Sequence, residues 1–261
     1  MSSKEFEKRL KEYYNKFNED KRLIRRHGQV EFITSMHYIK QYLETFNNPK
    51  VLDIGAGTGR YSIALYEEGY DVTAVELFKC NLNVLRAKNS NVKAYEGNAL
   101  DLKFLDDNSF DLTLLFGPMY HLHSLDDCLK ALNEAKRVTK PNGIIMVAYV
   151  MNDYSVITHI FKDGHYEDLN KLSEDFHIIS TEDDLYHQVR IEDLNLYNEL
   201  SGLKRLKLIA PDGPSDYIRP ILNKMSEEEF NIFLKYHLAT CERQDMLGAS
   251  SHTLDILLNT K

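Results

Sequence analysis

VLDIGAGTG, residues 51–59, is the stretch that decides the fold of this 261-residue chain. A short apolar segment containing Asp53 runs directly into three alternating glycines. Residues 61–68 then carry the apolar spacing of a helix. A strand, a glycine-rich turn and a helix place backbone N–H groups and a helix N-terminus at the carboxyl end of the strand, where open α/β sheets bind nucleotides.

Short apolar strands and amphipathic helices alternate through residue 150. Alternating elements of these lengths predict a parallel, doubly wound α/β sheet. The near-continuous apolar run at 111–116 is typical of a strand that is covered on both faces. We expect strands at 51–54, 71–76, 92–96, 111–116 and 143–150, and helices at 61–68, 78–88 and 125–138.

The pattern changes after Tyr149. Residues 151–190 are irregular and acidic, and we expect a largely helical insertion above the carboxyl ends of the strands. Ser226 and Glu229 have the spacing of a capping box, which predicts a helix start. In this second part we expect helices at 191–200, 217–225 and 226–241, and strands at 204–210 and 253–259.

Two helices are expected before the sheet. The first begins near a cap at Ser2 or Ser3, and its apolar stripe runs to Phe17. The second begins at about Gln29 and stops before Pro49.

The composition narrows the class of protein. The chain has 32 basic and 40 acidic residues, a net charge of −8, and this acidic balance disfavours general binding to nucleic acid. Its three cysteines are scattered, as expected for a reducing cytosol and not for a disulfide scaffold or a zinc site. We find no signal peptide and no apolar run near the ~20 residues that span a bilayer. We therefore expect a cytoplasmic protein without membrane contact.

The glycine spacing narrows the ligand. Asp53 and the glycines at 55, 57 and 59 give Asp-x-Gly-x-Gly-x-Gly, whereas the dinucleotide fingerprint requires Gly-x-Gly-x-x-Gly. This motif resembles the first motif of class I S-adenosylmethionine-dependent methyltransferases. The segment RVTKPNG at 137–143 likewise resembles the family's RVLKPGG. Within the family, the chain is most similar to the small-molecule branch that includes the quinone methylases.

The resemblance covers residues 50–150 well and 191–261 loosely. It implies a seven-stranded, Rossmann-like sheet with five parallel strands and a final antiparallel pair. Residues 1–48 would then form a helical N-terminal lid. Residues 49–261 would form the methyltransferase domain, with helical insertions at about 151–190 and 214–245.

The resemblance also implies a set of cofactor contacts. Glu76 ends the second strand, where a carboxylate can accept both ribose hydroxyls of an adenosyl group. Asn98 stands where the family usually has an acid that binds the adenine amino group, and its amide carbonyl can still accept from that group. The expected cofactor site comprises Asp53, Gly55, Ala56, Gly57, Gly59, Glu76, Leu77, Asn98, Ala99, Leu100, Phe116 and Gly117.

The turn after the strand at 111–116 is where an acceptor would lie. His121 aligns with a histidine that is common in the quinone-methylase branch, and it could act as a general base or pack beneath the cofactor. Tyr120 is its neighbour and the second candidate for catalysis. From the lid we expect Tyr14, Arg26 or His27 to close over the methionine end, with Arg26 suited to its carboxylate.

The sequence gives less information on the pocket for the methyl acceptor than on the cofactor site. The histidines at 151–190 lack the spacing of a helical metal pair, and we expect no metal. Candidates for substrate binding come from the insertions and the loop before the last strand: Tyr154, His159, Tyr217, Arg219, Arg243 and His252.

These expectations favour a methyltransferase that moves a methyl group from S-adenosyl-L-methionine to O, N or S of a small molecule, leaving S-adenosyl-L-homocysteine. An RNA or protein acceptor is the first alternative, and a non-catalytic cofactor-binding regulatory module is the second. The identity of the acceptor and the oligomeric state stay open at this point.

Overall fold

The computed structural model describes residues 8–10, 12, 25–89 and 91–261. These residues build one mixed sheet with the strand order β3-β2-β1-β4-β5-β8-β7. The pairs from β3 to β5 are parallel, whereas β8 runs antiparallel to both β5 and β7. The strands are β1 (Lys50–Ile54), β2 (Asp71–Glu76), β3 (Lys93–Glu96), β4 (Phe110–Leu115), β5 (Thr139–Met151), β7 (Lys204–Ile209) and β8 (His252–Leu258). The predicted sheet of five parallel strands and a final antiparallel pair is confirmed.

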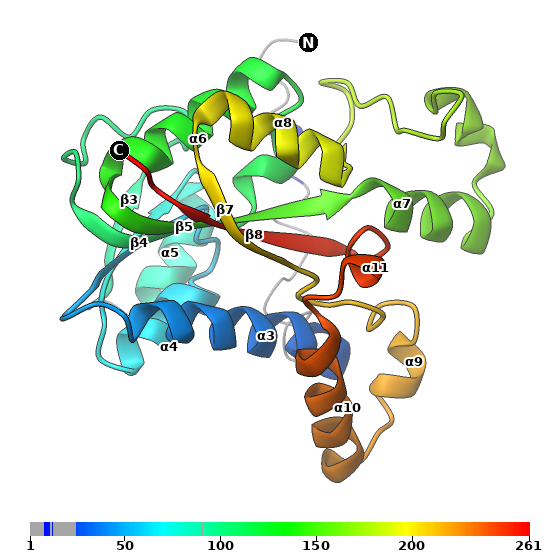
Figure 1. Ribbon diagram of the computed structural model, residues 1–261, viewed down its shortest axis with the longest axis horizontal. Helices are drawn as coiled ribbons and strands as arrows, with labels where there is room; N and C mark the ends of the chain where they lie inside the picture. Colours follow the sequence, from blue (N-terminus) through cyan, green and yellow to red (C-terminus); the bar gives the residue numbers. More distant parts are fainter. Residues whose placement is uncertain (1–7, 11, 13–24, 90) are drawn as a thin grey trace.

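Helices cover both faces of this sheet, which makes three layers (Figure 1). On one face lie α6 (Leu125–Val138) and α8 (Ile191–Ser201). On the other lie α3 (Arg26–Leu43), α4 (Arg60–Glu67) and α5 (Lys79–Lys88). The central strands are therefore buried on both faces, as the near-continuous apolar run at 111–116 predicted for β4.

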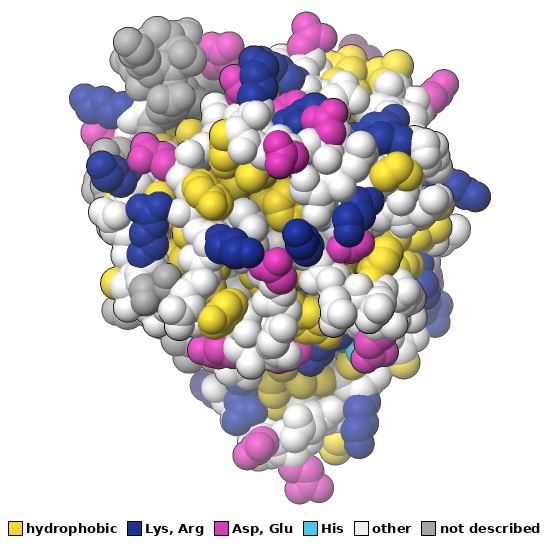
Figure 2. Space-filling view, turned by 90° about the vertical axis from the view of Figure 1, so that its left-hand side faces the viewer, with side chains coloured by type: hydrophobic (Ala, Val, Ile, Leu, Met, Phe, Trp, Pro, Cys, Tyr) yellow, Lys and Arg dark blue, Asp and Glu magenta, His cyan; other side chains and the backbone are white. Residues whose placement is uncertain are grey.

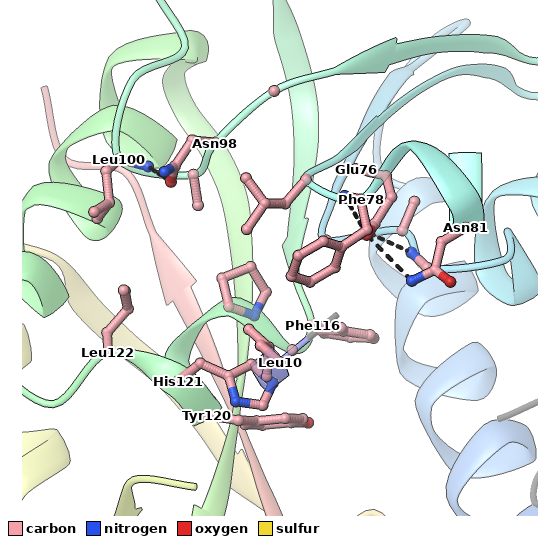
Figure 3. A pocket seen from close by; sticks show the side chains of 18 of the residues that line it. Leu10, Glu76, Phe78, Asn81, Asn98, Leu100, Phe116, Tyr120, His121 and Leu122 are labelled. Carbon is pink, nitrogen blue, oxygen red and sulfur yellow. Dashed lines mark hydrogen bonds between the residues drawn. The ribbon is translucent and has the colours of Figure 1, made fainter. Parts of the chain in front are cut away.

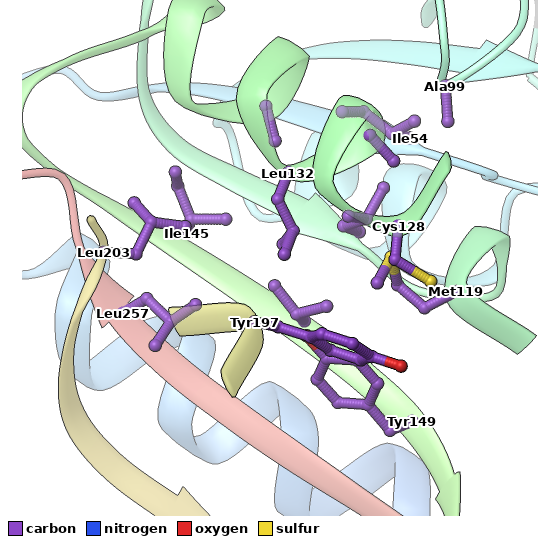
Figure 4. Close-up of a cluster of buried hydrophobic side chains, with 14 of the residues drawn as sticks. Ile54, Ala99, Met119, Cys128, Leu132, Ile145, Tyr149, Tyr197, Leu203 and Leu257 are labelled. Atoms are coloured by element: carbon purple, nitrogen blue, oxygen red, sulfur yellow. The ribbon is translucent and has the colours of Figure 1, made fainter. Parts of the chain in front are cut away.

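Successive side chains of β5 point to opposite faces of the sheet and pack in different helix layers. Ile145 and Val147 pack with α6 and α8, and Ile144 and Met146 pack on the opposite side with α3, α4 and α5. Figure 4 shows the first of these clusters, in which Leu132 of α6 lies over the sheet.

Helix α3 begins earlier than predicted and belongs to the core. Met36, Ile39 and Leu43 pack against the sheet, so this part of the N-terminal region forms a structural layer. The lid expected from residues 1–48 stays a prediction. The expected helix cap at Ser2 or Ser3 and the end of the apolar stripe at Phe17 lie outside the described residues.

The insertion is helical only in its first half. It contains α7 (Asn152–Ser155), a π-helical turn η2 (Val156–Lys162) and a 3₁₀ turn η3 (Tyr166–Lys171). It then returns to the sheet through β6 (Gln188–Val189), an additional short strand parallel to β5. The prediction of a helical insertion is thus correct for 152–171 and wrong for the irregular segment that follows.

The second insertion also differs in detail. The helix expected at 217–225 is reduced to α9 (Arg219–Leu222), with Pro220 in its first turn, where a residue without a backbone N–H is tolerated. Helix α10 (Glu227–Thr240) starts with the predicted capping box of Ser226 and Glu229. Besides β6, two more short elements were not predicted: η1 (Pro118–His121) and α11 (Gln244–Leu247).

Among the described residues, no helix is both long enough and apolar enough to span a membrane.

Candidate functional site

A cavity of about 670 Å³ opens at the carboxyl ends of β1, β2 and β4. Its walls come from the glycine-rich turn after β1, the end of β2, the loop after β3 and the 3₁₀ turn η1 (Figure 3). Leu10 and residues 180–182 also line it. The volume lies in the range of small-molecule and cofactor sites, about 300–1,000 Å³.

The three glycines of the turn adopt positive φ angles, which glycine tolerates without strain. A Cβ on Gly55 would lie 2.5 Å from Cδ of Pro118, so this position joins two walls of the cavity. A Cβ on Gly57 would meet no atom within 4 Å and would occupy open space. Gly59 does not line the cavity, because its Cβ position is filled by Leu85 of α5. Gly59 therefore serves packing, and Gly57 presents bare backbone to the cavity.

Asp53 is buried beneath this turn. The hydroxyl of Ser62 in α4 donates a hydrogen bond to Oδ2 of Asp53. Burial raises the pKa of the Asp53 carboxyl to about 6, and the nearby charge of Glu76 raises it further, although the Ser62 hydrogen bond lowers it. A charged carboxylate in this position costs folding free energy, and Asp53 lines the cavity.

Glu76 is held by N–H donors on both carboxylate oxygens. Oε2 accepts from the backbone N–H of Gly57 at 2.9 Å. Oε1 accepts from the backbone N–H of Phe78 at 2.9 Å and from the side-chain amide of Asn81 at 3.3 Å. Burial raises the pKa of Glu76, and the two backbone donors and Asn81 oppose this shift. The carboxylate is thus fixed at the cavity wall and tied directly to the glycine-rich turn (Figure 3).

Asn98 lines the opposite part of the cavity. Its side-chain carbonyl accepts the backbone N–H of Leu100 at 2.9 Å, which closes the turn after β3. This bond engages the oxygen that was expected to accept from an adenine amino group. One lone pair of this oxygen and the NH₂ group of Asn98 remain for a ligand.

Aromatic side chains from α3, α4 and the end of β4 pack against one another beside the cavity. The Tyr61 ring lies 5.2 Å from that of Phe32 and 5.1 Å from that of Phe116. The Arg60 guanidinium lies over Phe32 at 4.0 Å, a cation–π contact. Within the described part of the chain, Nε of Arg60 is buried without a hydrogen-bond partner. Arg60 lines the cavity, so it brings hydrogen-bond donors and a positive charge to this wall.

Tyr120 and His121 of η1 line the cavity side by side (Figure 3). Nδ1 of His121 donates to the carbonyl oxygen of Leu185 at 2.8 Å, which leaves the lone pair on Nε2. Burial lowers the pKa of His121 to about 4. At neutral pH His121 is therefore uncharged and a weak base, which suits a positioning role better than removal of a strongly held proton.

Several predicted site residues lie away from the cavity. Arg26 lies over the Phe230 ring at 5.1 Å, and Nδ1 of His27 bonds the Asn223 amide at 3.0 Å. Tyr14 lies outside the described residues. The structure thus brings Arg60, and not Arg26, to the cavity.

The predicted substrate residues do not line the cavity either. His159, Arg219 and Arg243 form surface ion pairs with Asp168, Asp216 and Asp245. Tyr154 and Tyr217 pack edge to face at 5.3 Å. His252 comes nearest, since its ring lies 5.5 Å from that of the cavity residue Tyr120.

Other cavity residues were not predicted. Some follow the recognised motifs directly and could have been found by extending them: Arg60, Tyr61, Phe78 and Asn81. His123 follows the predicted His121 by two residues. Others come from distant segments and carry no local signal: Leu10, Glu31, Ser180, Thr181 and Glu182.

Comparison with known proteins agrees with this geometry. Residues 52–147 match the family model described as a methyltransferase domain. This part of the chain is a class I methyltransferase domain. The methyltransferase domain holds the glycine-rich turn, Glu76, Asn98 and η1, and therefore most of the cavity.

Curated relatives align with the same region. A demethylmenaquinone methyltransferase from Renibacterium salmoninarum is 39% identical over 100 residues, covering 38% of this chain and 40% of the relative. An uncharacterized methyltransferase from Mycobacterium tuberculosis is 36% identical over 104 residues, 40% of this chain and 41% of the relative. The chain thus spans about two fifths of the length of these relatives.

Solved structures extend the likeness to the whole fold. A SAM-dependent methyltransferase from Methanosarcina mazei superimposes with a TM-score of 0.56 at 13% identity, over 85% of this chain and 96% of that one. One from Archaeoglobus fulgidus gives 0.55 at 18% identity, over 88% and 94%. At 13% and 18% identity, these similarities show that the chain shares the fold of these structures, and they show the fold alone.

Proposed function

We propose that this protein transfers a methyl group from S-adenosylmethionine to a small molecule. The observation that carries the proposal is Glu76 at the end of β2. Its carboxylate lies at the cavity wall, oriented by the Gly57 and Phe78 N–H groups, beside open space at the Cβ position of Gly57. A fixed carboxylate next to bare glycine backbone fits an adenosyl ribose.

The cofactor supplies an already activated methyl group, so the chain has to bind, orient and exclude water. Glu76 would hold the ribose hydroxyls, and Arg60 would hold the methionine carboxylate. The faces of Tyr61 and Phe116 suit a cationic sulfur, which cannot donate N–H bonds. Tyr120 and His121 would position the acceptor. Such positioning alone is worth about 7–11 kcal/mol of barrier lowering.

The cavity supports a small acceptor. Leu10 and residues 180–182 line it together with the strand ends, and a volume of about 670 Å³ suits a small ligand better than a folded polymer. On the face in Figure 2, basic and acidic side chains are interspersed, which does not favour a phosphate backbone. The printed name of one relative gives demethylmenaquinone as its acceptor, and a quinone-like ring compound is a reasonable first substrate to assay.

Two further points belong to this proposal. Leu10 at the cavity supports a role for residues 1–48 in closing it. The three free cysteines support a reducing, cytoplasmic location.

Calorimetry with S-adenosylhomocysteine and a transfer assay with methyl-labelled S-adenosylmethionine test the proposal. We expect one ligand bound per chain and label recovered in a small, extractable product. Absence of binding by the pure, folded protein would refute the proposal. Label found only in RNA or protein would refute the small-molecule acceptor while leaving the transfer reaction in place.

Gly57→Ala is expected to weaken binding of S-adenosylhomocysteine by about tenfold or more at a stability cost of about 1 kcal/mol. The added methyl group enters open space beside the ligand and clashes with no protein atom. Gly69→Ala is the matched control, because Gly69 also has a positive φ and an open Cβ position but lies outside the cavity. Equal affinities in the two variants would contradict the placement of the ligand beside Gly57.

Arg60→Met is expected to weaken binding of S-adenosylhomocysteine by about tenfold or more, because a charge-assisted hydrogen bond contributes about 1.5–3 kcal/mol. Binding of 5′-methylthioadenosine, which lacks the amino-acid end, should change little. Arg86→Met serves as control, since Arg86 bonds the Ala94 carbonyl outside the cavity. Equal losses for both ligands would show that Arg60 does not bind the carboxylate.

A further inference from the structure

Three metal-ligating side chains from distant parts of the chain meet beside the cavity. They are Glu31 of α3, Asp212 in the loop after β7, and His252, the first residue of β8. Nδ1 of His252 lies 2.7 Å from Oδ2 of Asp212 and 3.9 Å from Oε2 of Glu31. One ligand atom from each residue falls within 4.8 Å of the other two. Local spacing in the sequence could not reveal this cluster.

The cluster is largely removed from water. Asp212 is 2% exposed and Glu31 is 9% exposed. Two carboxylates beside one imidazole keep a net negative charge even when the imidazole is protonated. Carboxylate oxygens and an imidazole nitrogen grouped away from water are ligand types that divalent cations take in proteins.

Asp212 is oriented by hydrogen bonds on its other oxygen. Oδ1 accepts from the hydroxyl of Ser250 at 2.5 Å and from the backbone N–H of His252 at 3.1 Å. The Ser250 hydroxyl itself accepts from the backbone N–H of Gly213 at 2.9 Å. Oδ2 is thereby directed at the imidazole. Hydrogen-bonded support behind a ligating carboxylate is the usual outer shell of a metal site.

We propose that Glu31, Asp212 and His252 bind a first-row divalent metal ion. Metal–ligand bonds of about 2.1 Å place neighbouring ligand atoms roughly 3.0–3.4 Å apart, so these side chains need to shift by less than about 1 Å. One imidazole nitrogen and two carboxylate oxygens suit zinc or manganese better than the all-oxygen preference of magnesium and calcium. On binding, His252 exchanges its hydrogen bond with Asp212 for a bond from Nδ1 to the metal.

The site adjoins the acceptor end of the cavity. Glu31 lines the cavity, and the His252 ring lies 5.5 Å from that of Tyr120, which lines it too. Three protein ligands leave coordination positions for another molecule. Resting on the proposed function, this placement assigns the acceptor to compounds with a metal-coordinating oxygen, such as a hydroxyl whose pKa a bound metal lowers.

Titration of the chelator-treated, full-length protein with MnCl₂, followed by electron paramagnetic resonance of the free ion, tests the metal site. We expect one Mn²⁺ per chain, and binding at least tenfold weaker in His252→Ala and in Glu31→Gln. His159→Ala is the matched control, because His159 also lies 2.7 Å from a carboxylate, that of Asp168, without a third ligand. It should bind like the wild type.

Absence of stoichiometric binding by the wild type, or unchanged binding in both variants, would overturn the inference. Glu31→Gln keeps the size and polarity of the side chain, so it tests the site even where His252→Ala does not fold. The assay contains no S-adenosyl compound. If the protein binds S-adenosylhomocysteine but no Mn²⁺, the metal site is refuted and the proposed function stands. If it binds Mn²⁺ but no S-adenosylhomocysteine, the proposed function is refuted and the metal site stands.

Discussion

Replacing Glu76 by Ala is expected to weaken binding of S-adenosylhomocysteine by about 100-fold or more. Each charge-assisted hydrogen bond to a ribose hydroxyl contributes about 1.5–3 kcal/mol. The substitution also removes the acceptor for the Gly57, Phe78 and Asn81 donors, which loosens the turn that faces the ligand. Isothermal titration calorimetry measures the loss directly.

Glu96→Ala is the matched control for this experiment. Glu96 ends β3 in register with Glu76, but it is exposed and does not line the cavity. Its removal should leave the affinity within about twofold, since exposed side chains away from the ligand contribute little. Similar affinity for the wild type and the Glu76→Ala variant would contradict the assignment of the ribose to this strand end.

Asp53→Asn is expected to stabilise the ligand-free protein by about 3 kcal/mol at pH 8. The pKa of the buried Asp53 carboxyl is raised from 3.8 to about 6. The folded state therefore binds the proton more tightly than the unfolded state, and stability falls as pH rises through the window from about 4 to 6. Above pH 6 the carboxylate is charged and buried, a cost that the neutral amide avoids. Urea denaturation measures the difference.

The pH dependence separates this explanation from a simple packing effect. At pH 5 the gain should shrink to about half, because Asp53 is then mostly protonated in the folded protein. Asp71→Asn is the control, an exposed acid at the start of β2 that pairs with Lys93 at 2.7 Å. It should change stability by less than about 1 kcal/mol. A gain for Asp53→Asn that is the same at pH 5 and pH 8 would contradict the assigned cause.

The parts of the fold that local chemistry dictates were predictable. The bounds of β2 and α6 match the prediction. In β2, Asp71 and Glu76 flank a buried Val-Thr-Ala-Val segment, and Ser124 caps α6 by accepting the Asp127 N–H. The glycine-rich turn and the carboxylate at the end of β2 lie within a few residues of their strands. Sequence spacing therefore fixes their relative positions before any tertiary contact is known.

The acceptor side was not predictable, because it depends on contacts between distant segments. Arg26 was expected at the cofactor, but α3 directs it to Phe230 of α10. Glu31 and His252 approach each other only through the packing of α3 beside β8. Charged residues of the insertions, such as Arg219 and Arg243, pair locally on the surface instead.

A crystal structure of the protein with S-adenosylhomocysteine tests the central claim most directly. We expect the ribose hydroxyls within hydrogen-bond distance of the Glu76 carboxylate and the sulfur at the Phe116–His121 turn. A ligand bound elsewhere, or a cavity that stays empty at saturating ligand, would contradict it.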